Sequence, residues 1–262
     1  MKVARVIASI ITTLALTFSF VAAGLAVCLL PPVTHALASM FADDGTSPFS
    51  RAQLVQVADA TRDFSFGMHD ERDLYRVIYQ VDSEYQKSIT SSGGVLPADF
   101  PRLALVTDLS NLQQLRAAFS GASEMYCYSA DTIVHLNDCY RLASIGFPVA
   151  VVTAAIALVG LVFCGVTGRR RWLGGVMMAG GILLIVAFVG LVVWAIVDFN
   201  GFFTMFHQLF FSQGNWQFPY DSLLICSLPT AFWMGMGIVC AVVAFLLSLI
   251  FILIGSRLAR RR

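Results

Sequence analysis

Two of the four histidines have neighbours that suit proton transfer. His135 lies in the segment Asp131-Thr-Ile-Val-His-Leu-Asn-Asp138, where a helix would place Asp131, His135 and Asp138 on one face. A carboxylate beside an imidazole fixes its tautomer and raises its basicity, which a general base requires. Taken alone, the same spacing also fits an ordinary solvated helix face.

The second histidine, His207, lies in a phenylalanine-rich segment, Asp198–Phe211, between two long apolar runs. An apolar segment of about 10–14 residues is too short to cross a bilayer and more often lies at its surface. An imidazole held there could act on a molecule dissolved in lipid. An aromatic interfacial anchor would also explain the phenylalanines, but it does not require a histidine. In a helix, one stripe would consist of Phe199, Phe202, Phe206 and Phe210.

Other kinds of site have little support in the sequence. His35 and His69 lie in polar surroundings with no evident partner, so we expect both at the surface. No His-Glu-x-x-His or Gly-x-Ser-x-Gly motif occurs, so we predict no metal site, no cofactor and no serine nucleophile. Nucleic-acid binding is not expected, because acidic residues outnumber basic ones in the polar segments predicted on the outer side of the membrane.

The composition predicts an all-α membrane protein. The chain is 58% hydrophobic and 13% charged, and a transmembrane helix needs roughly 20 apolar residues. We predict a first transmembrane helix in residues 1–33 and an extracytoplasmic, mainly helical domain in 34–143. Residues 144–262 would hold three more helices and an outer interfacial segment at 198–230. The four uncharged runs are Val6–Leu30, Ile145–Val166, Leu173–Val197 and Phe232–Ile254.

The positions of the basic residues predict the orientation. Lys2 and Arg5 precede the first run, Arg169–Arg171 separate the second from the third, and Arg257–Arg262 end the chain. Short loops rich in Lys and Arg face the cytoplasm, so both termini would be cytoplasmic. A signal peptide is the alternative for the N-terminus, but the apolar run is too long for one. Pro31-Pro32 would then end the first helix.

Within the predicted outer domain, hydrophobic periodicity indicates helices over Asp70–Ile89 and Asp108–Phe119, the latter with Asp108 as N-cap. Ser50–Thr61 would be a third, shorter helix. A disulfide between Cys127 and Cys139 is an open alternative in an oxidising compartment. The pairs Gly174-Gly175 and Gly180-Gly181 favour close contact between membrane helices.

The order of these parts resembles the lipoprotein intramolecular transacylase family. One motif is the short His135-Leu-Asn-Asp138, and the likeness is strongest over Asp198–Trp233. Departures from the expected pattern are Cys139 in place of an aliphatic residue, Thr230 in place of an acidic one, and a longer outer domain. The quoted positions of the stronger match are Phe206-His-Gln-Leu-Phe-Phe211, Asn215-Trp216, Pro219, Asp221, Leu224-Ile225 and Leu228-Pro229.

The resemblance implies an enzyme of the bacterial cytoplasmic membrane whose partners are diacylglyceryl-modified lipoproteins and membrane lipid. It would move an acyl chain from the glycerol to the α-amino group of the N-terminal cysteine, and His135 and His207 would be catalytic. We expect Asp138 to orient His135 as base and His207 to act as donor, although the reverse assignment is open. Acyl chains would contact Phe202, Phe206 and Phe210, and Trp216 would set the depth.

Two other functions remain open at this point. One is a membrane lipid hydrolase or another transferase that uses the same two histidines. The other is a non-enzymatic four-span scaffold of the claudin or tetraspanin type. The tryptophan signature of the claudin outer loop is missing, because no tryptophan precedes Trp172.

Overall fold

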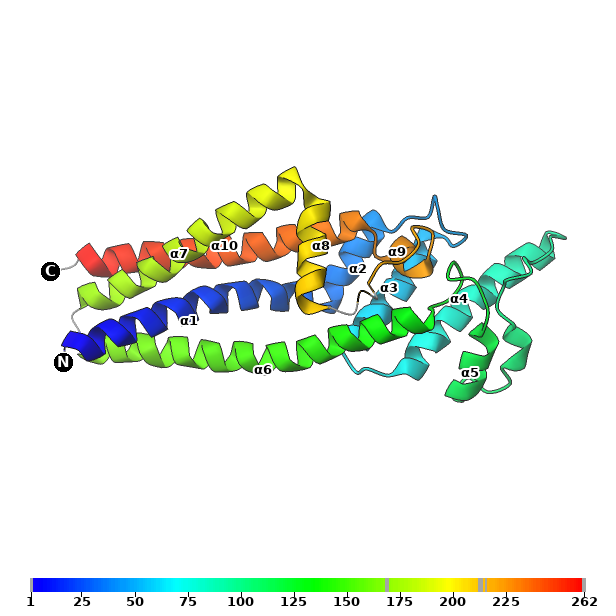
Figure 1. Ribbon diagram of the computed structural model, residues 1–262, viewed down its shortest axis with the longest axis horizontal. Helices are drawn as coiled ribbons and strands as arrows, with labels where there is room; N and C mark the ends of the chain where they lie inside the picture. The colour runs from blue at the N-terminus through cyan, green and yellow to red at the C-terminus, as the bar shows by residue number, and fades with distance from the viewer. Residues whose placement is uncertain (1, 168–169, 212–213, 215, 261–262) are drawn as a thin grey trace. The chain divides into compact units, whose positions relative to one another are not determined.

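The elements of the described chain are helical, which confirms the all-α fold class (Figure 1). The computed structural model describes residues 2–167, 170–211, 214 and 216–260. Arg169, Arg261 and Arg262, which contributed to the predicted orientation, and Asn215 of the second motif lie outside these residues. The elements are α1 (Lys2–Cys28), α2 (Pro31–Phe41), α3 (Arg51–Phe66), α4 (Glu71–Ser91), the 3-10 turn η1 (Leu103–Leu105), α5 (Leu112–Phe119), α6 (Ala130–Thr167), α7 (Arg170–Val197), α8 (Phe199–Phe210), α9 (Leu223–Ser227) and α10 (Thr230–Arg260).

The chain divides into two compact units. The bundle unit comprises Met1–Cys28, Ser144–Phe206 and Gly237–Arg262, and the cap unit comprises Leu29–Ala143 and His207–Met236. Four helices, α1, α6, α7 and α10, are long and apolar enough to cross a membrane. The protein is therefore an integral membrane protein with several spans.

Helix α6 is longer than a membrane requires. Its 38 residues extend about 57 Å at 1.5 Å per residue, against a hydrocarbon thickness of roughly 30 Å. The uncharged part, Ile145–Val166, is long enough to span the bilayer by itself. The first turns of α6, with Asp131, Asp138 and Arg141, therefore lie outside the membrane-spanning part.

Small residues let the helices of the bundle unit approach closely. Every long helix contributes to its core, which contains Ala15, Leu16 and Phe20 of α1, Ala157 of α6, Leu184 of α7 and Ala244 of α10. A Cβ atom on Gly174 would overlap the carbonyl oxygen of Gly255, so α7 and α10 touch through their backbones there. A Cβ on Gly181 would come within 2.7 Å of the carbonyl oxygen of Ser248. The predicted close contact is confirmed at these positions, whereas Gly175 has nothing within 4 Å of its Cβ position.

This difference gives a matched pair of substitutions. We expect Gly174→Ala to lower the melting temperature of the protein in detergent, because the new methyl group must push the α7 and α10 backbones apart. Gly175→Ala should be neutral or slightly stabilising, because the position is open and alanine is the better helix former. Thermal unfolding followed by circular dichroism measures both. An equal fall of the melting temperature in both variants would show that Gly174 does not act by allowing contact between the two backbones.

The cap unit is built around the contacts of α3 with α2, α4 and α9. Helix α3 begins with a capping box in which Ser50 and Gln53 exchange hydrogen bonds. The predicted helix at Ser50–Thr61 is thus confirmed and runs further, to Phe66. Asp70 caps α4 by accepting hydrogen bonds from two backbone amides. The N-cap of α5 is Asn111 and not the predicted Asp108, whose carboxylate instead accepts from Ser110.

The proline pair has a different role from the predicted one. Helix α1 already ends at Cys28, and Pro31 and Pro32 occupy the first positions of α2. Proline is well suited to these positions, because the first helical N–H groups have no partner within the helix. The carbonyl oxygen of Leu29 accepts hydrogen bonds from Arg62 Nε and Nη2, at 2.9 and 2.7 Å. The sequence analysis did not predict α2.

Asp82 is an unexpected carboxyl group in the core of the cap unit. It lies on the buried face of α4 and is 0% exposed. Among the described residues, neither of its carboxyl oxygens has a hydrogen-bond partner. Burial raises its pKa from 3.8 to about 9, because an ionised carboxylate loses its hydration there. Asp82 is therefore a neutral acid at neutral pH.

This burial predicts how stability depends on pH. The folded protein keeps the proton of Asp82, whereas the unfolded chain releases it above about pH 3.9. The contribution to stability is therefore complete below that pH and is lost as pH rises toward 9. We expect the melting temperature to fall between pH 5 and 9 and to fall much less in Asp82→Asn.

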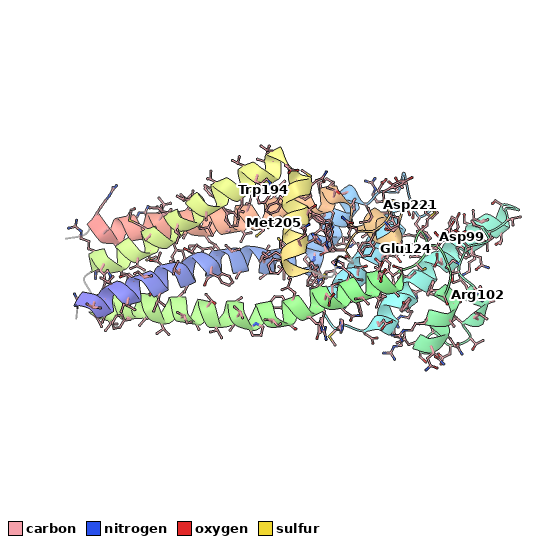
Figure 2. All side chains as sticks on the ribbon, viewed as in Figure 1. Asp99, Arg102, Glu124, Trp194, Met205 and Asp221 are labelled. Atoms are coloured by element: carbon pink, nitrogen blue, oxygen red, sulfur yellow. The ribbon has the colours of Figure 1, made fainter. Side chains whose placement is uncertain are left out.

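The exposed Asp99, labelled in Figure 2, provides the control. Asp99→Asn should keep the pH dependence of the unmodified protein. Parallel curves for the unmodified protein and Asp82→Asn would contradict the assignment of this pH dependence to Asp82.

Candidate active site

The first turns of α6 place His135 inside the cap unit. Ser129 begins the helix, because its hydroxyl accepts from the amide of Thr132 and its carbonyl accepts from that of Ile133. His135 is 8% exposed and Leu136 is 4% exposed. The stretch is helical, as the spacing required, but the Asp131 side chain is at the surface.

Helix α8 supplies the second imidazole from its last turn. His207 is 9% exposed, and its carbonyl oxygen accepts a hydrogen bond from the amide of Phe211 at 2.6 Å. The ring centroids of His135 and His207 are 6.0 Å apart, and the ring planes make an angle of 27°. Two histidines that are far apart in the chain thus form one pair within the cap unit.

Aromatic rings surround this pair. The ring centroid of Phe211 is 4.8 Å from that of His135 and 5.6 Å from that of His207. Phe218 lies 5.7 Å from His135, and Trp216 lies 4.9 Å from His207, again between centroids. We call Phe211, Trp216 and Phe218 the aromatic cage. The sequence analysis did not assign Phe211 or Phe218 to the site, although Phe211 lies four residues after His207.

Desolvation controls the charge of His135. Its pKa is lowered from 6.5 to about 4, chiefly by burial and also by the nearby His207, while Asp138 partly opposes both. His135 is therefore a neutral imidazole at physiological pH. No described residue forms a hydrogen bond with its Nδ1 atom, so Asp138 acts on the ring through its charge. Nε2 lies 3.7 Å from Cys139 Sγ.

The two cysteines of the open disulfide alternative are not bonded to each other. The thiol of Cys127 is buried and contacts the carbonyl oxygens of Phe119, Ala122 and Ser123. The thiol of Cys139 faces His135 instead.

The aromatic residues of α8 differ in their exposure. Phe206 and Phe210 are 40% and 45% exposed, and Phe202 is half-buried. Asp198 accepts a hydrogen bond from the amide of Gly201 and thus stabilises the start of α8. The segment after the helix is held by a bond of 2.8 Å from the amide of Leu223 to the carbonyl of Glu124; Figure 2 labels Glu124 and the nearby Asp221.

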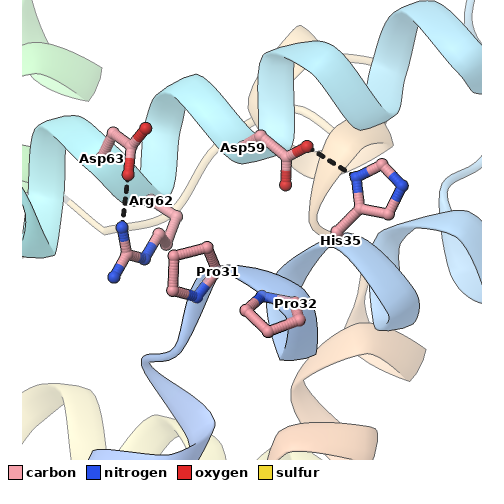
Figure 3. A pocket seen from close by; sticks show the side chains of 6 residues that line it. All are labelled: Pro31, Pro32, His35, Asp59, Arg62 and Asp63. Carbon is pink, nitrogen blue, oxygen red and sulfur yellow. Dashed lines mark hydrogen bonds and ion pairs between the residues drawn. The ribbon is translucent and has the colours of Figure 1, made fainter.

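The other two histidines belong to different environments. His35 is exposed, as expected, and its Nδ1 lies 2.7 Å from Asp59. Both line an open cleft of about 470 Å³ beside Pro31 and Pro32 (Figure 3). The polar side chains of this cleft pair with one another, His35 with Asp59 and Arg62 with Asp63.

His69 is half-buried and has close ring partners, which the sequence did not indicate. Its ring is stacked between Phe64 and Tyr140, with centroid distances of 4.5 and 3.7 Å. Its backbone has a φ of 57°, which is uncommon for a residue with a side chain. The bond between its Nδ1 and the carbonyl of Phe64, at 2.8 Å, helps to hold this conformation.

Comparison with known proteins identifies the family. Residues 105–233, which include both histidines and the aromatic cage, match the family described as lipoprotein intramolecular transacylase Lit. The chain belongs to the lipoprotein intramolecular transacylase family. This is a family of acyltransferases, so the predicted class of enzyme is confirmed.

A solved structure shares the fold of this chain. The integral membrane lipoprotein intramolecular transacylase Lit from Bacillus cereus is 14% identical and has a TM-score of 0.68, with 98% of this chain and 97% of that one covered. A histidine-to-arginine variant of that Bacillus cereus protein is 13% identical, with a TM-score of 0.48 and coverages of 97% and 91%. No curated protein sequence matches this chain.

The aromatic cage predicts the behaviour of His135 in titration. We expect Phe211→Ala to raise the pKa of His135 from about 4 toward 6.5, because removal of the buried ring admits water and lowers the desolvation cost. Nuclear magnetic resonance of the labelled imidazole measures this pKa.

The neighbouring Phe210 is the control, because it is exposed. Phe210→Ala should leave the titration of His135 unchanged. An unchanged pKa in Phe211→Ala would mean that this ring does not desolvate His135.

Proposed function

We propose that this protein moves an acyl chain within a diacylglyceryl-modified lipoprotein. The chain passes from the glycerol to the α-amino group of the N-terminal cysteine, and the product is the lyso-form lipoprotein. Family membership supports the reaction class. The observation that carries the proposal is the proximity of His135 and His207 inside an aromatic cage.

The proposed reaction needs no nucleophile from the protein. The α-amine of the substrate attacks the carbonyl carbon of the ester, a tetrahedral oxyanion forms, and the bond to the glycerol oxygen breaks. The amine loses a proton and the departing alkoxide gains one, so an amide and an alcohol result. Because donor and acceptor belong to one molecule, the protein supplies orientation, which can be worth several kcal/mol.

The environments of the two imidazoles support one assignment of roles. The sequence suggested His135 as base, with the reverse open. A pKa of about 4 for His135 makes it a weak base at neutral pH, but a neutral imidazole can still donate a hydrogen bond. We assign His135 to stabilise the oxyanion and His207 to accept the proton of the amine and pass it to the alkoxide.

His207 suits a base for a further reason. It lies in the last turn of α8, where the negative end of the helix dipole favours a protonated imidazole. The charge of Asp138 partly offsets the lowering of the pKa of His135.

The remaining predicted residues would receive the lipid. The stripe of Phe202, Phe206 and Phe210 lies on the helix that carries His207, and its exposed rings at 206 and 210 fit contact with acyl chains. Trp216 would position the substrate near His207, against which it packs.

We propose that the active site faces away from the cytoplasm. Arg170 and Arg171 start α7, and Arg257 and Arg260 lie in the last turn of α10. These basic ends fit the cytoplasmic side, and both termini would lie there as well. Residues 34–143 would then be the extracytoplasmic domain, and 198–230 the outer interfacial segment.

The test compares single substitutions in cells that make diacylglyceryl lipoproteins. We expect His135→Ala and His207→Ala each to lower acyl transfer by roughly 10²–10³-fold, because each removes a proton-transfer group or an oxyanion donor. His35→Ala, on the cap-unit surface, should be as active as the unmodified protein. Mass spectrometry of the N-terminal lipopeptide reads the outcome.

The total number of acyl chains separates the competing functions. The proposed reaction keeps that number and places one chain on nitrogen. Loss of a chain would indicate a hydrolase, and an unchanged lipopeptide would indicate a protein without this activity. Either result would contradict the proposal.

A further inference from the structure

Cys139 contacts the Nε2 atom of the His135 ring. The other ring nitrogen, Nδ1, has no hydrogen-bond partner among the described residues. Cys139 lies one helical turn after His135 on α6, and its Sγ is 3.7 Å from Nε2. Burial raises the pKa of this thiol to about 12, so the group remains an S–H at physiological pH. The contact is thus between a thiol and a neutral imidazole.

A neutral imidazole has one nitrogen that donates and one that accepts. If the thiol donates to Nε2, a weak donor meets a good acceptor, and the ring proton lies on Nδ1. In the opposite arrangement, Nε2–H would point at sulfur, which is a weak acceptor. The first arrangement makes better use of the imidazole lone pair.

In this tautomer, Nδ1 carries a proton and can donate a hydrogen bond. It belongs to a side chain that is 8% exposed, and it has no hydrogen-bond partner among the described residues. A buried donor without a partner is costly and calls for a functional reason. A substrate oxyanion would be such a partner, because it accepts a hydrogen bond only while the reaction proceeds.

We propose that Cys139 is a positioning residue that holds His135 in the tautomer with its proton on Nδ1, so that this N–H meets the ester oxygen of the substrate. The inference rests on the proposed function for the identity of the oxygen. Cys139 itself takes no part in bond making. The sequence analysis had noted this cysteine only as a departure from an expected aliphatic residue.

The tautomer can be measured without substrate. In protein with isotope-labelled histidine, the nitrogen chemical shifts show which ring nitrogen carries the proton, and His135→Ala assigns the signal. We expect protonated Nδ1 in the unmodified protein and a shift toward protonated Nε2 in Cys139→Ala. Cys139→Ser, which retains a donor, should restore protonated Nδ1. The matched control is Cys127→Ala, because Cys127 is buried and its thiol, among the described residues, bonds to backbone carbonyls and not to a side chain.

The same variants are then compared in acyl transfer. We expect Cys139→Ala to lower kcat roughly five- to tenfold with KM unchanged, as for the loss of one neutral hydrogen bond, and Cys139→Ser to recover most of it. Protonated Nε2 in the unmodified protein, a tautomer that is the same in Cys139→Ala, or full activity of that variant would each overturn the inference. Absence of transfer by the unmodified protein would instead overturn the proposed function, and this is measured first.

Discussion

The desolvation of His135 is the constraint on which the rest of the site depends. A charged imidazole is disfavoured among buried aromatic rings, and the neighbouring His207 disfavours it further, so one member of the pair is held neutral. A pair in which both rings were protonated would place like charges close together at low dielectric. His135 is therefore held in the neutral form, which can donate a hydrogen bond without carrying a charge.

A ring stays buried only if the residues around it are held in place. In the cap unit, contacts of residues before and after His135 in the chain hold them. Before His135, the hydroxyls of Thr61 and Tyr128 share a hydrogen bond of 2.6 Å. After it, Tyr140 stacks on His69, whose unusual backbone conformation is held by its own bond to Phe64. The chain that follows His207 is tied to the same core through α9. Both imidazoles are thus fixed by one small set of helices within the cap unit.

Local patterns in the sequence were enough for most of the elements, for the family and for the two histidines, but not for how the site is assembled. Uninterrupted apolar runs specify the four long helices, and the spacing of apolar residues on α4 specifies its buried face. Helix α2 was not predicted, because Pro31-Pro32 was interpreted as the end of the first helix and no other signal indicated that a new helix begins there. Asp82 was missed because its polar side chain contradicts the face on which it lies. The approach of His135 to His207, and the part of Phe218, depend on tertiary packing, which periodicity does not encode.

Under the proposed function, the aromatic cage also decides between transfer and hydrolysis. An imidazole that can deprotonate an amine can equally deprotonate water, so the identity of the residues does not choose the reaction. Exclusion of water does, together with an amine that is tethered to the ester it attacks. His135 and His207 are 8% and 9% exposed, and the phenylalanine rings of the cage have no polar group that could hold a water molecule. This shielding of the two histidines favours the nucleophile that the substrate brings with it.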